Sequence, residues 1–154
     1  MNSTVFLTVL SGVTTFVIGQ LIVKLVIDPV QEMKKTIGQI SHSMIEYANV
    51  IANPGVLSDD IMNETSKHLR QLSSQLHAHL YIVPQYQKTA KVFGLPGKEE
   101  VLAASGSLIG LSNSVFRAGS SDRIYEQNAK RVEIVRDSLG IYMAEGDRLP
   151  KDQA

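Results

Sequence analysis

Residues 1–23 are mostly apolar and carry no charged side chain before Lys24. Twelve of the nineteen residues from Val5 to Val23 are valine, leucine, isoleucine or phenylalanine. A hydrocarbon core about 30 Å thick needs roughly 20 helical residues. Those apolar side chains contribute on the order of −4 to −7 kcal/mol toward insertion. No basic residue precedes the run and no small-residue cleavage motif follows it, as a signal peptide would require. The pattern therefore predicts a transmembrane helix over residues 1–27.

The cations beside this helix indicate its orientation. Lys24, Lys34 and Lys35 follow it, whereas no lysine or arginine precedes it. The positive-inside rule then places the N-terminus outside and the rest of the chain in the cytoplasm, at a bacterial inner (plasma) membrane. We expect the three lysines to contact lipid headgroups and the lipid bilayer to be the first partner of the protein.

Small and polar residues repeat at helical spacing inside the apolar run. Such spacing lets two helices approach closely in lipid, and a polar side chain can hydrogen-bond across the contact. The run therefore predicts a packing face on the membrane helix. Its members are Thr8, Ser11, Gly12, Thr15, Gly19 and Gln20.

Beyond the apolar run, apolar residues alternate spacings of three and four. This is the a/d pattern of a helix that packs along one seam, and it predicts a helix to about residue 52. The pattern leaves open whether the seam packs on helices of the same chain or on a second copy. The seam residues are Val30, Met33, Ile37, Ile40, Met44, Tyr47 and Ile51.

Asp28 and Pro29 interrupt the helix where it would leave the membrane. Proline removes a backbone donor and clashes with the carbonyl four residues back, so we expect a kink or a helix restart. The stretch from Asp28 to Ile40 resembles the first helix of a HAMP signalling module, with proline followed by spaced apolar residues. The connector and second helix of that family do not follow, because Ser41–Ile51 continues the heptad. The family assignment therefore fails, and it assigns no functional residues.

Helical stripes separated by glycine and proline account for the rest of the chain. We predict helices over about 58–83, 84–94, 99–118 and 122–145, the third rich in small residues that suit close packing. The predicted class is all-α. A single N-terminal transmembrane helix, kinked near Pro29, continues into a cytoplasmic antiparallel bundle of about four main helices. The predicted units are the anchor (1–27), the bundle (28–146) and a flexible tail (147–154).

Composition narrows the possible functions. Fifteen basic and fifteen acidic side chains cancel, which argues against nucleic acid as a partner. The chain has no cysteine, so thiol catalysis and cysteine-ligated metals are excluded. His42 and Glu46 share a helix face, but no further ligand stands near them in sequence. No nucleotide-binding or nucleophile motif is present. We expect no enzyme activity, no cofactor and no metal site.

These observations favour a membrane-anchored protein that acts by interaction. Self-association, or the anchoring of a larger membrane or cytoplasmic complex, fits the seam and the small-residue face best. A membrane-linked signal relay through Pro29 and a small pore or effector component are the alternatives, and an enzyme ranks last.

Overall fold

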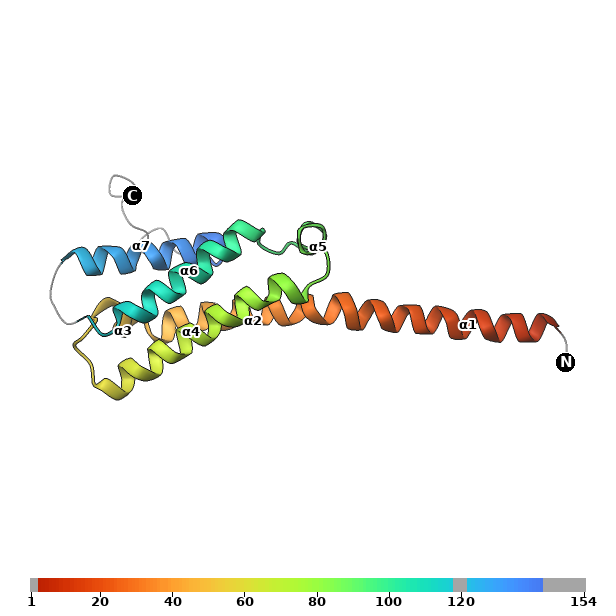
Figure 1. The fold of residues 1–154 in the computed structure, drawn as a ribbon, viewed down its shortest axis with the longest axis horizontal. Coiled ribbons are helices and arrows are strands. Elements are labelled where there is room, and N and C mark those ends of the chain that lie inside the picture. Colours follow the sequence, from red (N-terminus) through yellow and green to blue (C-terminus); the bar gives the residue numbers. More distant parts are fainter. Residues whose placement is uncertain (1–2, 118–121, 143–154) are drawn as a thin grey trace.

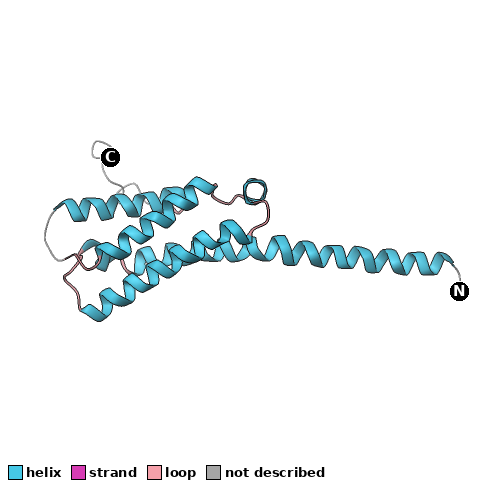
Figure 2. Ribbon diagram, viewed as in Figure 1, coloured by secondary structure: helices cyan, strands magenta, loops and turns pink. Residues whose placement is uncertain are grey.

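The structure is a computed structural model, and it describes residues 3–117 and 122–142. These residues form helices joined by short loops, with no strand in the described ranges (Figure 2). This confirms the predicted all-α class. The elements are α1 (Ser3–Ile22), the π-helical η1 (Val23–Ile27), α2 (Asp28–Glu46), α3 (Ala48–Ala52), α4 (Asp59–Ile82), α5 (Tyr86–Phe93), α6 (Lys98–Ser114) and α7 (Asp122–Leu139).

A helix of 44 residues, Ser3–Glu46, joins the N-terminal apolar run to the bundle. Its first half, α1, projects from the bundle as a rod, and its second half, α2, lies among the other helices (Figure 1). By length and composition this helix could cross a membrane, as the sequence predicts. None of the side chains of α1 is buried within the chain, unlike those of a core helix.

A π-helical turn lies directly before Pro29. The Asp28 N–H donates to the Val23 carbonyl five residues back, instead of four. Pro29 has no N–H to donate, and a π turn is one way a helix adjusts its backbone pairing near such a residue. Ile27 and Asp28 both keep right-handed helical φ and ψ, so the helix does not restart at Asp28. The kink near Pro29 stays a prediction.

Four helices surround the main core. α4 packs on both α2 and α6, and α7 packs on α6 (Figure 1). In chain order α2, α4, α6 and α7 run in alternating directions (Figure 1), as short connections favour. The core contains large aliphatic side chains from all four, among them Met33, Ile40, Leu69, Leu108 and Val135, each fully buried. A smaller cluster of Val50, Met62 and Val115 closes the end far from α1.

Two short helices complete the bundle. α3 continues α2 after a single turn residue, Tyr47, so the helix predicted to reach residue 52 is nearly continuous. α5 corresponds to the predicted short helix that ends at Gly94. Gly94 adopts φ +65°, and the Leu95 N–H donates to the Ala90 carbonyl, as in a Schellman C-cap.

The predicted end of the last helix is wrong. α7 ends at Leu139, whereas the sequence pattern suggested Glu145. Gly140 has φ +66°, and the Ile141 N–H donates to the Arg136 carbonyl, which closes the helix with the same capping motif. The residues 143–146 and the predicted tail 147–154 lie outside the described residues.

The small residues of α6 allow close helix packing, as the sequence predicts. Ser105 faces Ser73 of α4, and each hydroxyl lies within hydrogen-bond distance of the other residue's carbonyl, at 2.9 and 3.1 Å. A Cβ atom on Gly110 would lie 2.6 Å from Nε of Arg131 on α7. Packing against both neighbours therefore offsets the low helix propensity of glycine and serine in this helix.

Candidate functional site

The small-residue face of α1 is fully open. All six of its members, Thr8, Ser11, Gly12, Thr15, Gly19 and Gln20, have exposed side chains. Space around Gly12 and Gly19 is empty to 4 Å from a hypothetical Cβ. Thr8 donates to the Thr4 carbonyl, so its hydroxyl is satisfied within the helix. No residue in the described ranges 3–117 and 122–142 covers this face, so among them it is open to lipid or to another helix.

The flanking charges lie where the apolar helix meets the bundle. Lys24 donates to the Asp28 carboxylate at 2.9 Å, one turn further along. Lys35 lies 3.7 Å from Glu32, and Lys34 is exposed on α2. The Asp28 carboxylate therefore pairs with Lys24 on the same helix.

The seam lies inside the chain. Val30, Met33, Ile40, Met44 and Ile51 are buried in the core shared with α4, α6 and α7. Ile37 and Tyr47 pack against the same core and are half-buried. The seam thus has partners within one chain, and contacts between copies would have to use other surfaces.

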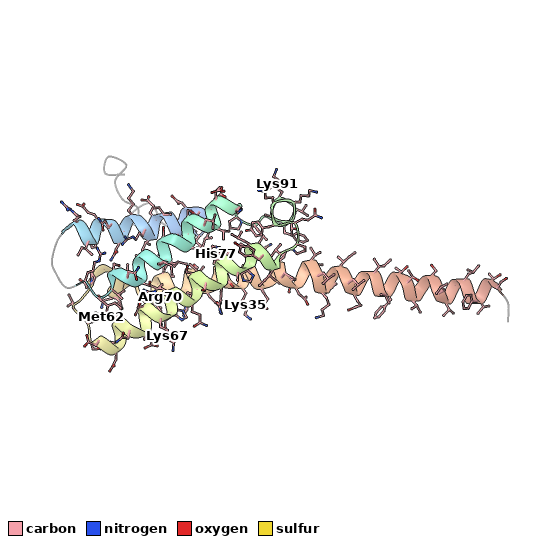
Figure 3. All side chains as sticks on the ribbon, viewed as in Figure 1. Lys35, Met62, Lys67, Arg70, His77 and Lys91 are labelled. Atoms are coloured by element: carbon pink, nitrogen blue, oxygen red, sulfur yellow. The ribbon has the colours of Figure 1, made fainter. Side chains whose placement is uncertain are left out.

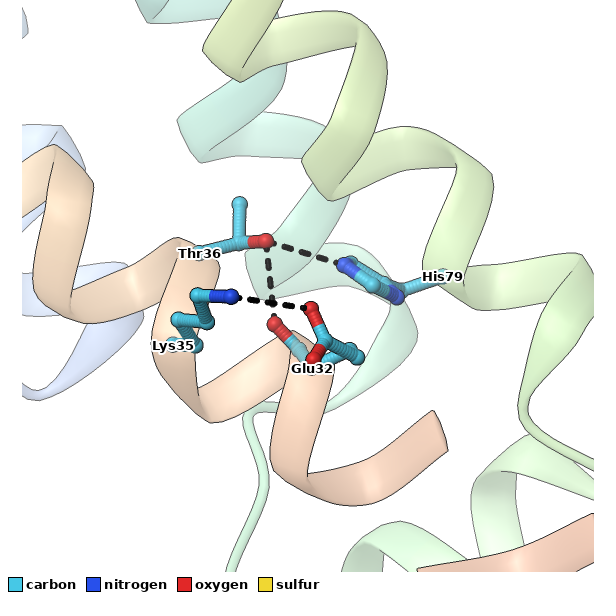
Figure 4. Close-up of polar contacts among 4 residues, drawn as sticks. All are labelled: Glu32, Lys35, Thr36 and His79. Carbon is cyan, nitrogen blue, oxygen red and sulfur yellow. Dashed lines mark hydrogen bonds and ion pairs between the residues drawn. The ribbon is translucent and has the colours of Figure 1, made fainter. Parts of the chain in front are cut away.

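Two polar contacts join α2 to α4 inside the bundle. The Ser43 hydroxyl lies 2.9 Å from Nε2 of His68. Deeper in the core, the Thr36 hydroxyl lies 3.0 Å from Nε2 of His79 and donates to the Glu32 carbonyl (Figure 4). Sequence reasoning missed both pairs, because their members lie 25 and 43 residues apart. The sequence did contain one indication of these pairs. Thr36 and Ser43 lie at helical spacing from the seam residues, so they face the same side of the helix as the seam.

The hydrogen bonds of Thr36 favour one tautomer of His79. Thr36 has one hydroxyl proton, which the Glu32 carbonyl accepts, so Nε2–H of His79 donates to the Thr36 oxygen. Nδ1 is then the unprotonated nitrogen, and it is buried with no hydrogen-bond partner among the residues that the structure describes. Burial lowers the pKa of His79 because the imidazolium would lose its hydration, and the Glu32 carboxylate opposes this shift more weakly.

The bundle should therefore lose stability in mild acid. Because the folded-state pKa of His79 is lowered, the unfolded chain binds its proton more readily as the pH falls below about 6.5. The free energy of unfolding should decrease from neutral pH toward the folded-state pKa and then level off for this group. Denaturant titrations of the full chain in detergent at a series of pH values measure this slope.

His79→Gln keeps a hydrogen-bond donor toward Thr36 and removes the titrating ring. The free energy of unfolding of this variant should therefore depend less steeply on pH than that of the wild type. His42→Gln is the matched control, because it removes an exposed histidine of α2. Equal slopes for wild type and His79→Gln would contradict the assignment.

α5 crosses the bundle at the end from which α1 projects (Figure 1). Gln85, with φ +45°, turns the chain sharply before it. The Tyr86 hydroxyl donates to the Pro96 carbonyl at 2.7 Å, and burial raises the pKa of Tyr86 to about 12. Tyr86 and Ala90 point inward, so the opposite side of α5 is solvent-facing.

That outer side combines cations with apolar groups. Lys88, Lys91 and Val92 are exposed on α5, and Figure 3 shows Lys91 directed away from the bundle. Tyr81 and Ile82, at the end of α4, are 79% and 57% exposed. Two adjoining cavities of about 590 and 560 Å³ border α5, and Lys88 and Lys98 line both. We call the residues Tyr81, Ile82, Lys88, Lys91, Val92 and Lys98 the α5 surface.

The histidines form no metal centre in the part of the chain that the structure describes, where no three potential ligands come together. His42 lies 3.5 Å from the Glu46 carboxylate on an exposed helix face. His77 stacks on Tyr81, with ring centroids 5.8 Å apart. Comparisons with protein-family models, curated proteins and solved structures find no match.

Proposed function

We propose that this protein is a single-pass, membrane-anchored helical bundle that acts by interaction at a bacterial inner membrane. In this proposal α1 spans the bilayer with its N-terminus outside. The bundle lies on the cytoplasmic side, where it anchors a larger assembly or a second copy of the chain. The contact residues would be exposed groups on α1 and on the bundle.

The exposure of α1 carries the proposal. From Ser3 to Ile22 every side chain is exposed, and none is charged. Leaving this much apolar surface in water costs roughly 25 cal/mol per Å². Contiguous apolar surface of this extent is typical of a membrane or protein contact. The length matches a bilayer core.

Membrane fractionation and cysteine labelling test the anchor and its orientation. The full chain should stay with the membranes through an alkaline wash and require detergent for release. Because the native chain has no cysteine, Ser3→Cys and Asn63→Cys each carry a single thiol. A membrane-impermeant maleimide on intact cells should label Ser3→Cys and leave Asn63→Cys unlabelled until lysis. Release by alkali would contradict the anchor, and the reverse labelling pattern would contradict the orientation.

Self-association would use the small-residue face of α1, since the seam is buried inside the chain. Thr15→Cys lies on that face, and Val17→Cys lies on the opposite side of the same helix turn. In a parallel dimer, oxidation should cross-link Thr15→Cys far more than Val17→Cys. Equal cross-linking, or a monomer mass in detergent for the wild type, would contradict self-association through this face.

A further inference from the structure

The strongest unassigned feature outside the anchor is the α5 surface. Its three lysines, Lys88, Lys91 and Lys98, form no ion pair within the described residues. Glu99 and Glu100 border one of the two cavities, where three lysines also lie. The positive charges therefore outnumber the negative charges there. Val92 is 77% exposed beside these cations. A free-standing cationic and apolar surface of this kind suits an anionic partner with an apolar layer beneath it.

The position of the surface indicates which partner that is. α5 lies beside the stretch where η1 passes into α2, and Figure 1 shows it end-on while α1 runs across the view. If α1 crosses a bilayer, α5 therefore lies flat at the bilayer surface. Tyrosine is enriched at this depth, and lysine reaches the phosphates there.

Resting on the proposed function, we propose that the α5 surface binds the anionic phospholipid surface of the same bilayer that α1 spans. Lys88, Lys91 and Lys98 contact headgroup phosphates, and the cavities beside them provide room for a headgroup. Tyr81, Ile82 and Val92 enter the interfacial layer. The bundle thus has a second membrane contact, which fixes its tilt about the junction at Pro29.

Tryptophan fluorescence in reconstituted vesicles tests the contact. The native chain has no tryptophan, so each variant of the full chain reports one position. Val92→Trp reports the α5 surface, and Val56→Trp reports an equally exposed site at the far end of the bundle. Phe16→Trp reports the anchor. The probe is a vesicle of phosphatidylcholine and phosphatidylglycerol that contains brominated acyl chains, which quench tryptophan on contact.

We expect quenching of Phe16→Trp and Val92→Trp and none of Val56→Trp. Quenching of Val92→Trp should weaken in pure phosphatidylcholine and at high salt. Lys88→Gln and Lys91→Gln, added to Val92→Trp, should each lower the ratio of docked to free bundle about fivefold.

Quenching of Phe16→Trp without quenching of Val92→Trp would overturn the α5 contact and leave the anchor intact. Failure of both would overturn the anchor as well. If the quenching of Val92→Trp is the same in neutral and anionic vesicles and is unchanged by both lysine substitutions, the role of the phosphates is overturned. Shielding of Val92→Trp from an aqueous quencher without quenching by lipid would assign the surface to a protein partner instead.

Discussion

Replacing Val13 and Val17 together by arginine is expected to shift the protein from the membrane fraction to the soluble fraction. Each arginine near the middle of a span costs about 2.5–3.5 kcal/mol, so the pair costs roughly 5–7 kcal/mol. The apolar residues of the span supply a similar amount in the opposite sense. Val17 lies on the helix side opposite Thr15 and Gly19, and both substitutions place a charge near the middle of the span. Fractionation after an alkaline wash measures the shift.

The bundle should survive this double substitution. No side chain of α1 is buried against it, so the arginines remove no packing contact. Val13→Leu with Val17→Leu is the matched control, which changes the same positions and should stay in the membrane. A Val13→Arg/Val17→Arg protein that resists alkali as the wild type does would contradict a bilayer around α1, whatever the state of the bundle.

Most of the helical pattern could be predicted because it depends on local periodicity. The phase of Met33, Ile40 and Met44 on one helix side is set by their spacing, and all three are buried. The apolar run likewise required no tertiary information. The end of the short helix at Gly94 also follows from the local sequence, because glycine is a frequent helix terminator.

Features that depend on distant residues or on one backbone conformation could not be predicted in the same way. Gly140 ends α7 although the sequence predicts a helix to about residue 145, because a single glycine inside a helical pattern does not reveal its own φ. The Thr36–His79 pair requires knowing which turn of α4 faces which turn of α2. The α5 surface arises because Gln85 turns the chain across the bundle, and no periodicity encodes that angle.

The sequence also could not show which helix the seam residues pack against. A heptad pattern is satisfied equally by a neighbouring helix of the same chain or by a second copy, because both supply apolar side chains at the same spacing. The packing of α2 on α4 decides the matter in favour of one chain. The case for self-association therefore depends on α1 alone, and a substitution in the seam becomes a test of fold stability.

Ile40→Ala should destabilise the bundle strongly. Ile40 is fully buried where α2 meets the core, and truncating a buried isoleucine leaves a cavity and costs about 2–5 kcal/mol. That is a large share of the 5–15 kcal/mol typical of a domain. Hydrogen exchange of α4 and α6 in the detergent-solubilised chain measures the effect on the bundle separately from α1, which detergent keeps helical.

Ile45→Ala is the matched control, since Ile45 is the same residue type on the same helix and is 71% exposed. Its exchange rates should stay close to those of the wild type. The free energy of unfolding derived from them should change by less than about 0.5 kcal/mol. If the seam instead joined two copies, Ile40→Ala would weaken the oligomer, and the exchange of α4 and α6 would depend on protein concentration. A concentration-independent loss confined to Ile40→Ala is the result that an intramolecular seam requires, because every partner of Ile40 then belongs to its own chain.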